Sequence, residues 1–170
     1  YDYQITNMGN KLTLGTFCHE NGHMVCSFPD LYDYGKSGIT SFGVGNYCLM
    51  AYGGDDKNPV QVSAYLKYKA GWADKATSLE AGIHTARAGK NEFFKIAKSP
   101  VEYYIIEARN RDKRDRSLPS AGLAIWHVDE LGNNDYEDMT PQKHFECSLI
   151  QADGQYHLER GINAGDARDL

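Results

Sequence analysis

Apolar side chains recur at helical spacing over residues 11–26, and no proline interrupts this segment. The apolar positions are Leu12, Leu14, Phe17, Met24 and Val25. A second apolar segment lies between Pro59 and Gly71. Proline suits the first turn of a helix and glycine commonly ends one, so this pattern predicts a helix over Pro59–Ala70.

The pattern changes to that of β-strands from about residue 78 onward. Short runs rich in β-branched and aromatic residues predict strands. These runs are Phe93–Ile96, Tyr103–Glu107, Leu123–Val128 and Ser148–Gln151. The charged residues 109–116 predict a solvent-exposed loop, and the glycine-rich residues 27–58 predict ordered turns. The sequence therefore predicts an α+β fold, with a helical portion over residues 1–77 and a β-rich portion over residues 78–170.

Composition and charge exclude several classes of protein. The chain has 170 residues, with 41% hydrophobic residues, 24% charged residues and a net charge of −5. An acidic chain of this kind is not expected to bind the phosphate backbone of nucleic acids. No apolar run approaches the length that a membrane span requires. Since few residues precede the first motif, we expect the chain to be an internal piece of a longer protein.

The clearest chemical motif is His19-Glu20-Asn21-Gly22-His23, which has the pattern H-E-x-x-H. Positions four apart on a helix lie on one face, so His19 and His23 can bind one zinc ion. Glu20 points away from that axis and can act as a general base toward water. The alternative is that the pattern arose by chance in a helix that binds no metal.

A catalytic zinc site needs a third protein ligand. Asp30 and Asp33 follow His23 by seven and ten residues, and either carboxylate could return to the metal after the helix ends. We favour Asp30, because Pro29 restricts the chain direction just before it. The alternative is that both aspartates cap turns in the Asp-Leu-Tyr-Asp segment.

Met50 lies in a turn-rich segment downstream of the two histidines. A methionine in this position is typical of the Met-turn of metzincins, where its sulfur packs below the metal without binding it. Tyr52 lies two residues further on, where some metzincins place a tyrosine that contacts zinc or stabilises the oxyanion. The alternative is that Met50 is an ordinary core residue.

Several segments resemble the immune inhibitor A-type family of secreted zinc metallopeptidases. They are Cys18–Cys26, Phe28–Gly35, Gly43–Met50, Tyr103–Asn110, Gly122–Asp129 and Gln151–Gly154. The resemblance implies a metzincin-like catalytic fold, secretion, and zinc-dependent endopeptidase activity on extracellular protein or peptide substrates. By position, it implies that His19, His23 and Asp30 are zinc ligands and that Glu20 is the base.

The sequence departs from the metzincin pattern just after the second histidine. Cys26 occupies the place of the usual glycine, and Pro29 occupies the place of the third ligand, one residue before Asp30. A left-handed turn costs more at cysteine than at glycine. We therefore expect the helix to run slightly further before the chain turns.

Other residues allow weaker hypotheses. We expect one disulfide within the first fifty residues, formed among Cys18, Cys26 and Cys48, although buried thiols are the alternative. Two oxygen-rich groups could suit calcium, with a solvated loop as the simpler explanation. They are Asp129, Glu130, Asp135, Glu137 and Asp138, and, separately, Asp153 and Asp166. His84, His127, His144 and His157 form no spaced pair, so structural or surface roles are expected for them.

Two other classes of function remain open at the level of sequence. The chain could be a catalytically inactive, zinc-containing adhesin or glycan-binding module whose β-rich portion carries the function. It could also be a structural domain that binds no metal.

Overall fold

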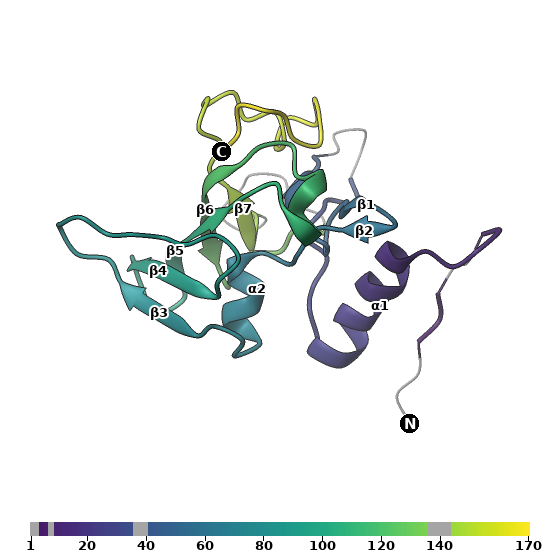
Figure 1. Cartoon of the computed structure of the whole chain (residues 1–170), viewed down its shortest axis with the longest axis horizontal. Coiled ribbons are helices and arrows are strands. Elements are labelled where there is room, and N and C mark those ends of the chain that lie inside the picture. Colours follow the sequence, from purple (N-terminus) through teal and green to yellow (C-terminus); the bar gives the residue numbers. More distant parts are fainter. Residues whose placement is uncertain (1–3, 7–8, 36–40, 136–143) are drawn as a thin grey trace.

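A computed structural model describes residues 4–6, 9–35, 41–135 and 144–170 of the chain. The fold is α+β, with two α-helices, a five-stranded sheet and a two-stranded ribbon in the described residues. Figure 1 shows helix α1 (Leu14–Cys26) and the ribbon on one side, and the larger sheet with helix α2 (Ala64–Lys69) on the other. The C-terminal residues, in yellow, lie over one end of the sheet.

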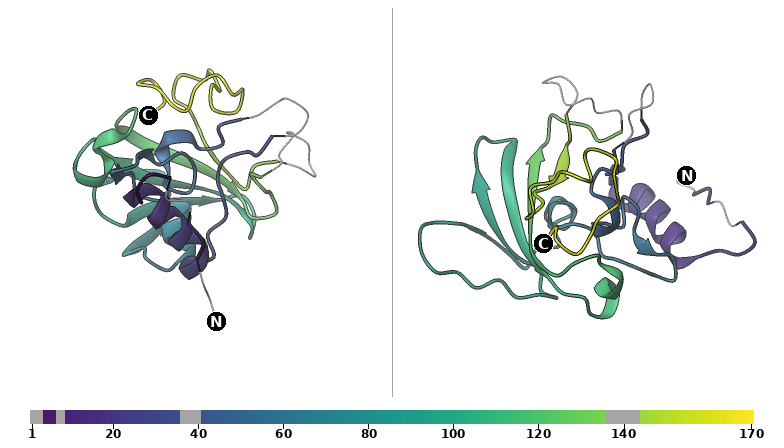
Figure 2. Two further views of the ribbon diagram at one scale, coloured as in Figure 1. Left: turned by 90° about the vertical axis from the view of Figure 1, so that its right-hand side faces the viewer. Right: turned by 90° about the horizontal axis from the view of Figure 1, so that it is seen from above.

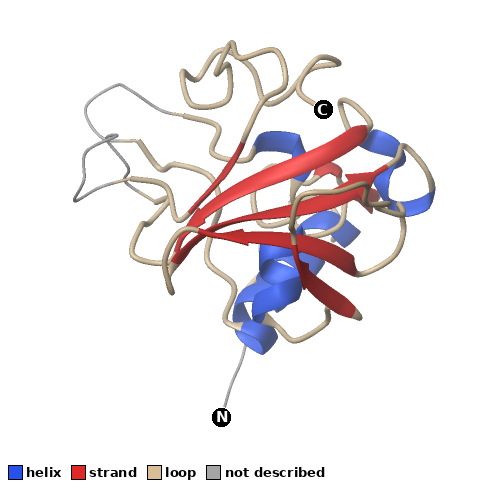
Figure 3. Ribbon diagram, turned by 90° about the vertical axis from the view of Figure 1, so that its left-hand side faces the viewer, coloured by secondary structure: helices blue, strands red, loops and turns tan. Residues whose placement is uncertain are grey.

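The larger sheet has the strand order β3-β4-β5-β6-β7. Its strands are β3 (Lys75–Ser78), β4 (Glu92–Ala97), β5 (Glu102–Arg109), β6 (Gly122–Asp129) and β7 (Cys147–Leu149). Strands β3 and β4 are parallel and all other neighbours are antiparallel. The four strands expected from the sequence overlap β4, β5, β6 and β7, although β7 ends at Leu149 and not at Gln151; Figure 3 shows the strands in red.

Alternation along β5 and β6 explains where the core lies. Every second residue of β5 is buried, and so are Ala124, Trp126 and Val128 of β6. Because strand side chains alternate between faces, these residues share one face of the sheet, against which α2 packs. The resulting hydrophobic core also includes Phe28, Leu31 and Met50. Buried side chains from both sides of residue 77 thus belong to one cluster.

Helix α1 spans most of the segment predicted to be helical, and its two buried residues are glycines. Its buried residues are Gly15 and Gly22, whereas Phe17 and Val25 are 44% and 70% exposed. A Cβ at Gly15 would lie only 3.0 Å from the Cα of Asp56. The Gly15 N–H donates to the Asp56 carbonyl oxygen at 2.7 Å, which satisfies one of the free N–H groups at the helix start.

Helix α1 ends where we expected from the presence of Cys26 at the position of the usual metzincin glycine. The helix continues through Cys26, and Ser27 then adopts the left-handed conformation with a φ of 53°. The N–H of Ser27 donates to the His23 carbonyl oxygen at 3.0 Å and that of Phe28 to the Gly22 carbonyl oxygen at 3.2 Å. This turn sends the chain back toward the face of α1 that carries both histidines.

The predicted start of the second helix at Pro59 is wrong. Pro59 belongs to strand β2 (Asn58–Pro59), which pairs with β1 (Gly54–Asp55), and α2 begins only at Ala64. The side chain of Ser63 caps the helix by accepting a hydrogen bond from the N–H of Leu66 at 3.4 Å. Among the described residues, neither α-helix has the length and hydrophobicity that a membrane span requires.

The charged residues 109–116 are not simply a solvent-exposed loop, as the sequence predicted. Arg109 and Asp115 are both buried, and the guanidinium forms two hydrogen bonds of 2.7 and 2.8 Å with the Asp115 carboxylate. Arg109 also donates to the Tyr47 carbonyl oxygen at 3.2 Å and to Glu107 at 3.2 Å. These contacts attach the sheet to the segment that leads to Met50.

The expected disulfide is absent, since all four cysteines are free thiols. Cys18 and Cys26 are eight residues apart on α1, which places their Cα atoms about 12 Å apart at 1.5 Å per residue. A disulfide needs Cα atoms within about 7 Å. Cys48 and Cys147 are buried, and burial raises the pKa of both thiols.

We expect Glu107→Ala to lower the free energy of unfolding by about 3–5 kcal/mol, because buried Lys67, whose Nζ lies 3.5 Å from Glu107 Oε2, loses its partner charge. Glu107 also accepts hydrogen bonds from Trp126 Nε1 and from the N–H of Ala64, each at 3.0 Å. Urea unfolding measures the change. The control is Glu102→Ala on the same strand, whose carboxylate pairs with Lys98 near solvent. Equal losses in the two variants would contradict the stabilising role of Glu107.

Candidate metal centre

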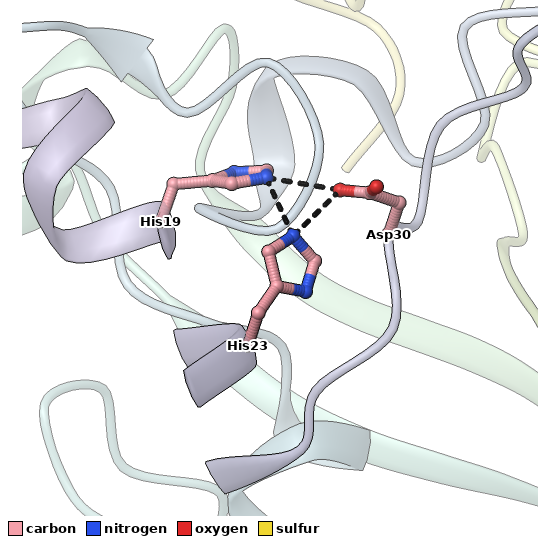
Figure 4. Close-up of side chains that lie close together, drawn as sticks. All are labelled: His19, His23 and Asp30. Atoms are coloured by element: carbon pink, nitrogen blue, oxygen red, sulfur yellow. Dashed lines mark hydrogen bonds and ion pairs between the residues drawn. The ribbon is translucent and has the colours of Figure 1, made fainter. Parts of the chain in front are cut away.

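The two histidines and Asp30 converge at one point (Figure 4). The Nε2 atoms of His19 and His23 are 3.1 Å apart. Asp30 Oδ1 lies 2.9 Å from His19 Nε2 and 3.2 Å from His23 Nε2. Two ligand atoms from α1 and one from the segment that follows it therefore form a small triangle.

Each imidazole is oriented by a backbone carbonyl group. His19 Nδ1 lies 2.9 Å from the Leu49 carbonyl oxygen, and His23 Nδ1 lies 2.6 Å from the Phe28 carbonyl oxygen. A carbonyl oxygen only accepts hydrogen bonds, so each Nδ1 must carry the proton. In the neutral ring this leaves the Nε2 lone pair free and directed at the triangle, as in metal-binding histidines.

The charges of the triangle are coupled. Burial alone would lower the pKa of His19, but its hydrogen bond to Asp30 helps to raise it above the ordinary value. Burial alone would raise the pKa of Asp30, but the hydrogen bond from His19 helps to lower it. A positive charge is therefore favoured at this point, and a metal cation would compete there with a proton.

Met50 is fully buried and packs against Gly22 of α1. A Cβ at Gly22, between the two histidines in the sequence, would lie 2.6 Å from Met50 Sδ, so any larger residue there would force the methionine side chain to move. The Met50 carbonyl oxygen accepts a hydrogen bond from the N–H of Leu31 at 2.6 Å. Met50 thus joins the helix to the segment that carries Asp30.

A cavity of about 330 Å³ opens beside His19. Glu20 and Tyr52 line it together with Tyr32 and Leu49. Tyr52 is 47% exposed and packs against Tyr32, with ring centroids 6.1 Å apart. The cavity therefore brings the expected base and the expected oxyanion donor next to a histidine of the triangle.

Asp33 lies outside the triangle. It is buried, and its two carboxylate oxygens accept hydrogen bonds from the N–H groups of Gly35 at 2.9 Å and Ser41 at 3.1 Å. Asp33 therefore accepts backbone hydrogen bonds as a capping residue does, a role that the alternative interpretation gave to both aspartates. Asp30 is the aspartate that the fold brings to the histidines.

Sequence reasoning missed two tyrosines at this centre. The hydroxyl of Tyr34 donates a hydrogen bond to Asp30 Oδ2 and in turn accepts one from Tyr32 at 3.2 Å. The Tyr32 ring lies 6.3 Å from the ring of His19, between centroids. No spacing signal identifies these contacts, because they depend on how the loop after Pro29 turns.

The oxygen-rich groups considered for calcium have different surroundings. Asp129 Oδ2 contacts His144 Nε2 at 2.9 Å, and Glu137 and Asp138 lie outside the described residues. Asp153 and Asp166 come together with His157 in the C-terminal segment. Of the four histidines expected to have structural or surface roles, His157 is therefore the one that lies in a second group of potential metal ligands within the described residues.

Comparison with known proteins does not assign the chain to a family. No protein-family model, no curated protein and no solved structure matches the chain. A functional interpretation must therefore rest on the residues of the site themselves.

Proposed function

We propose that this chain carries the zinc site of a metal-dependent endopeptidase, with His19, His23 and Asp30 as the protein ligands. The observation that carries the proposal is the triangle of two Nε2 atoms and one carboxylate oxygen, with edges of 2.9 to 3.2 Å. Tetrahedral zinc with bonds of about 2.0–2.1 Å separates its ligand atoms by about 3.3–3.4 Å, so a small expansion accommodates the ion.

The donor set also fits zinc in its chemistry. Imidazole and carboxylate are common zinc ligands, and a catalytic site uses three protein ligands with a fourth position open. The carbonyl groups of Leu49 and Phe28 hold both rings in the tautomer that can bind a metal. Zinc held there would polarise a substrate carbonyl and lower the pKa of water.

The residues around the cavity support peptide hydrolysis. Glu20 lines the cavity beside His19, where its carboxylate would take a proton from the attacking water and pass it to the leaving amine. Tyr52 would donate a hydrogen bond to the developing oxyanion. The buried Met50 below α1 supports the metzincin-like interpretation. The substrates we propose are extracellular proteins or peptides, cleaved by a secreted enzyme.

Zinc affinity distinguishes the roles of the two aspartates. We expect Asp30→Ala to weaken zinc binding by more than about 100-fold, beyond the 10–100-fold effect typical of outer-shell partners. Asp33→Ala should lower stability, because two backbone N–H groups lose their acceptor, but the folded protein should still bind one zinc ion. Competition with a chromogenic chelator measures the zinc affinity of both variants. Unchanged zinc affinity in Asp30→Ala would overturn the assignment.

Glu20→Gln should keep zinc and lose about 100-fold or more in the rate of peptide cleavage, the scale of general acid–base catalysis. A quenched fluorescent peptide reports the rate, and metal analysis of the same sample reports zinc. Glu80→Gln, an exposed carboxylate outside the cavity, is the matched control. The parent chain and the Glu80→Gln control could both bind zinc and yet cleave no peptide. In that case the chain is an inactive zinc-containing module and not an enzyme.

Tyr34→Phe should weaken zinc binding by about 10-fold, because the lost hydroxyl no longer orients Asp30 from its second oxygen. Tyr156→Phe, which removes a hydroxyl from an exposed tyrosine, should leave zinc affinity unchanged. The same chelator competition measures both variants. Equal affinities in the two would show that Tyr34 does not position the carboxylate.

A further inference from the structure

The cavity beside His19 has a charge pattern that the chemistry of peptide hydrolysis does not explain. Its volume of about 330 Å³ is at the lower end of the range for ligand pockets, so it suits one side chain better than a long segment. Two acidic residues line it, Glu20 and Asp56, and no lysine or arginine of the described residues does. Glu20 is the proposed base, which leaves Asp56 without a role.

Asp56 lies in the turn between β1 and β2, against the start of α1. The right-hand view of Figure 2 shows α1, in purple, beside this ribbon. The Asp56 carbonyl oxygen accepts the N–H of Gly15 at 2.7 Å, and its Oδ1 lies 2.9 Å from the position of a Cβ at Gly15. Gly15 also lines the cavity, so the Asp56 carboxylate is held at the cavity wall.

The Asp56 carboxylate lies within reach of a side chain bound next to the triangle of ligand atoms. Gly15 and His19 are four residues apart on one face of α1, which separates their Cα atoms by about 6 Å along the helix axis. A lysine side chain spans roughly 6 Å from Cα to Nζ at ordinary bond lengths. A substrate residue bound beside His19 can therefore place its terminal charge at Asp56.

The charge of Asp56 is not neutralised by the protein. Within the described residues its carboxylate makes no ion pair and accepts no hydrogen bond. Neighbouring Asp55, in contrast, accepts a hydrogen bond from the N–H of Lys57 at 2.8 Å. Lys57 itself is exposed and does not line the cavity. A cation that enters the cavity thus meets a carboxylate that is free to form charge-assisted hydrogen bonds.

Two tyrosine rings give the cavity an aromatic wall. Tyr32 and Tyr52 both line it, and Phe42 packs against Tyr52 with ring centroids 5.2 Å apart. The face of a tyrosine ring attracts cations, and it also packs against the apolar stem of lysine or arginine. The aromatic wall and the unpaired carboxylate together suit a long side chain that ends in a positive charge.

We propose that this cavity binds a lysine or arginine side chain next to the scissile bond of the substrate, and that Asp56 recognises its charge. The inference rests on the proposed function, since it names the substrate class of the same site. The alternative role of Asp56 is structural, because a negative charge near the first turn of a helix stabilises that helix. A structural role alone predicts that Asp56→Asn lowers the melting temperature and leaves cation binding unchanged.

Binding of benzamidinium, an aromatic cation, tests the cavity without turnover or bound metal. We expect Asp56→Asn to raise its dissociation constant by about 10-fold or more, the scale of a lost hydrogen bond between charged groups. Uncharged benzamide should bind the parent chain more weakly by a similar factor. Asp55→Asn, which keeps a side-chain acceptor for Lys57, should bind benzamidinium as the parent does. Nuclear magnetic resonance titration measures all four. Absence of benzamidinium binding, or equal binding by the parent and Asp56→Asn, would overturn the proposal.

Two quenched fluorescent peptides that differ only in lysine or norleucine beside the scissile bond test the specificity. The parent chain should cleave the lysine peptide with a kcat/KM at least about 10-fold higher, and Asp56→Asn should lose this preference but still cleave the norleucine peptide. Equal cleavage of the two peptides by the parent would overturn this inference and leave the proposed function in place. If the parent cleaved neither peptide, the proposed function would fail, and benzamidinium binding would still decide whether Asp56 recognises a cation.

Discussion

Two hydrogen bonds between imidazole rings and backbone carbonyls determine the geometry of the candidate zinc centre. One joins His19 to Leu49 and the other joins His23 to Phe28. Each bond fixes a ring plane and a tautomer at once, so both Nε2 atoms face Asp30. Without these bonds the rings could rotate, and a metal would have to order them on binding.

The positions of the Leu49 and Phe28 carbonyl groups depend in turn on contacts made by the neighbouring segments. Phe28 follows the left-handed turn at Ser27, and Leu49 precedes the buried Met50. Further away, Arg109 bonds to the Tyr47 carbonyl oxygen and to Asp115, which ties the segment before Met50 to the large sheet. The sheet therefore contributes to the site although none of its residues belongs to the triangle of ligand atoms.

The sequence predicted the parts of the fold that depend on local periodicity. The spacing of His19 and His23 has meaning only on a helix, and α1 is a helix through both. The four β-strands could be predicted because their residues alternate or favour extended backbone. The choice of Asp30 over Asp33 followed from the stiffness of Pro29, and the fold brings Asp30 to the histidines.

Features that depend on tertiary contact could not be predicted. Pro59 suits the start of a helix and also an edge strand, and only pairing with β1 decides between them. Arg109 and Asp115 have the sequence character of solvent-exposed residues, yet each supplies the partner that makes burial of the other tolerable. The Tyr34 hydroxyl reaches Asp30 through a loop path that no spacing encodes.

X-ray absorption at the zinc edge of the purified, zinc-loaded chain tests the central claim most directly. The account predicts a zinc ion with two imidazole nitrogens and one carboxylate oxygen at about 2.0–2.2 Å, and with no sulfur ligand. A shell that contains cysteine sulfur at about 2.3 Å, a shell without imidazole, or no bound zinc at all would contradict the assignment of His19, His23 and Asp30.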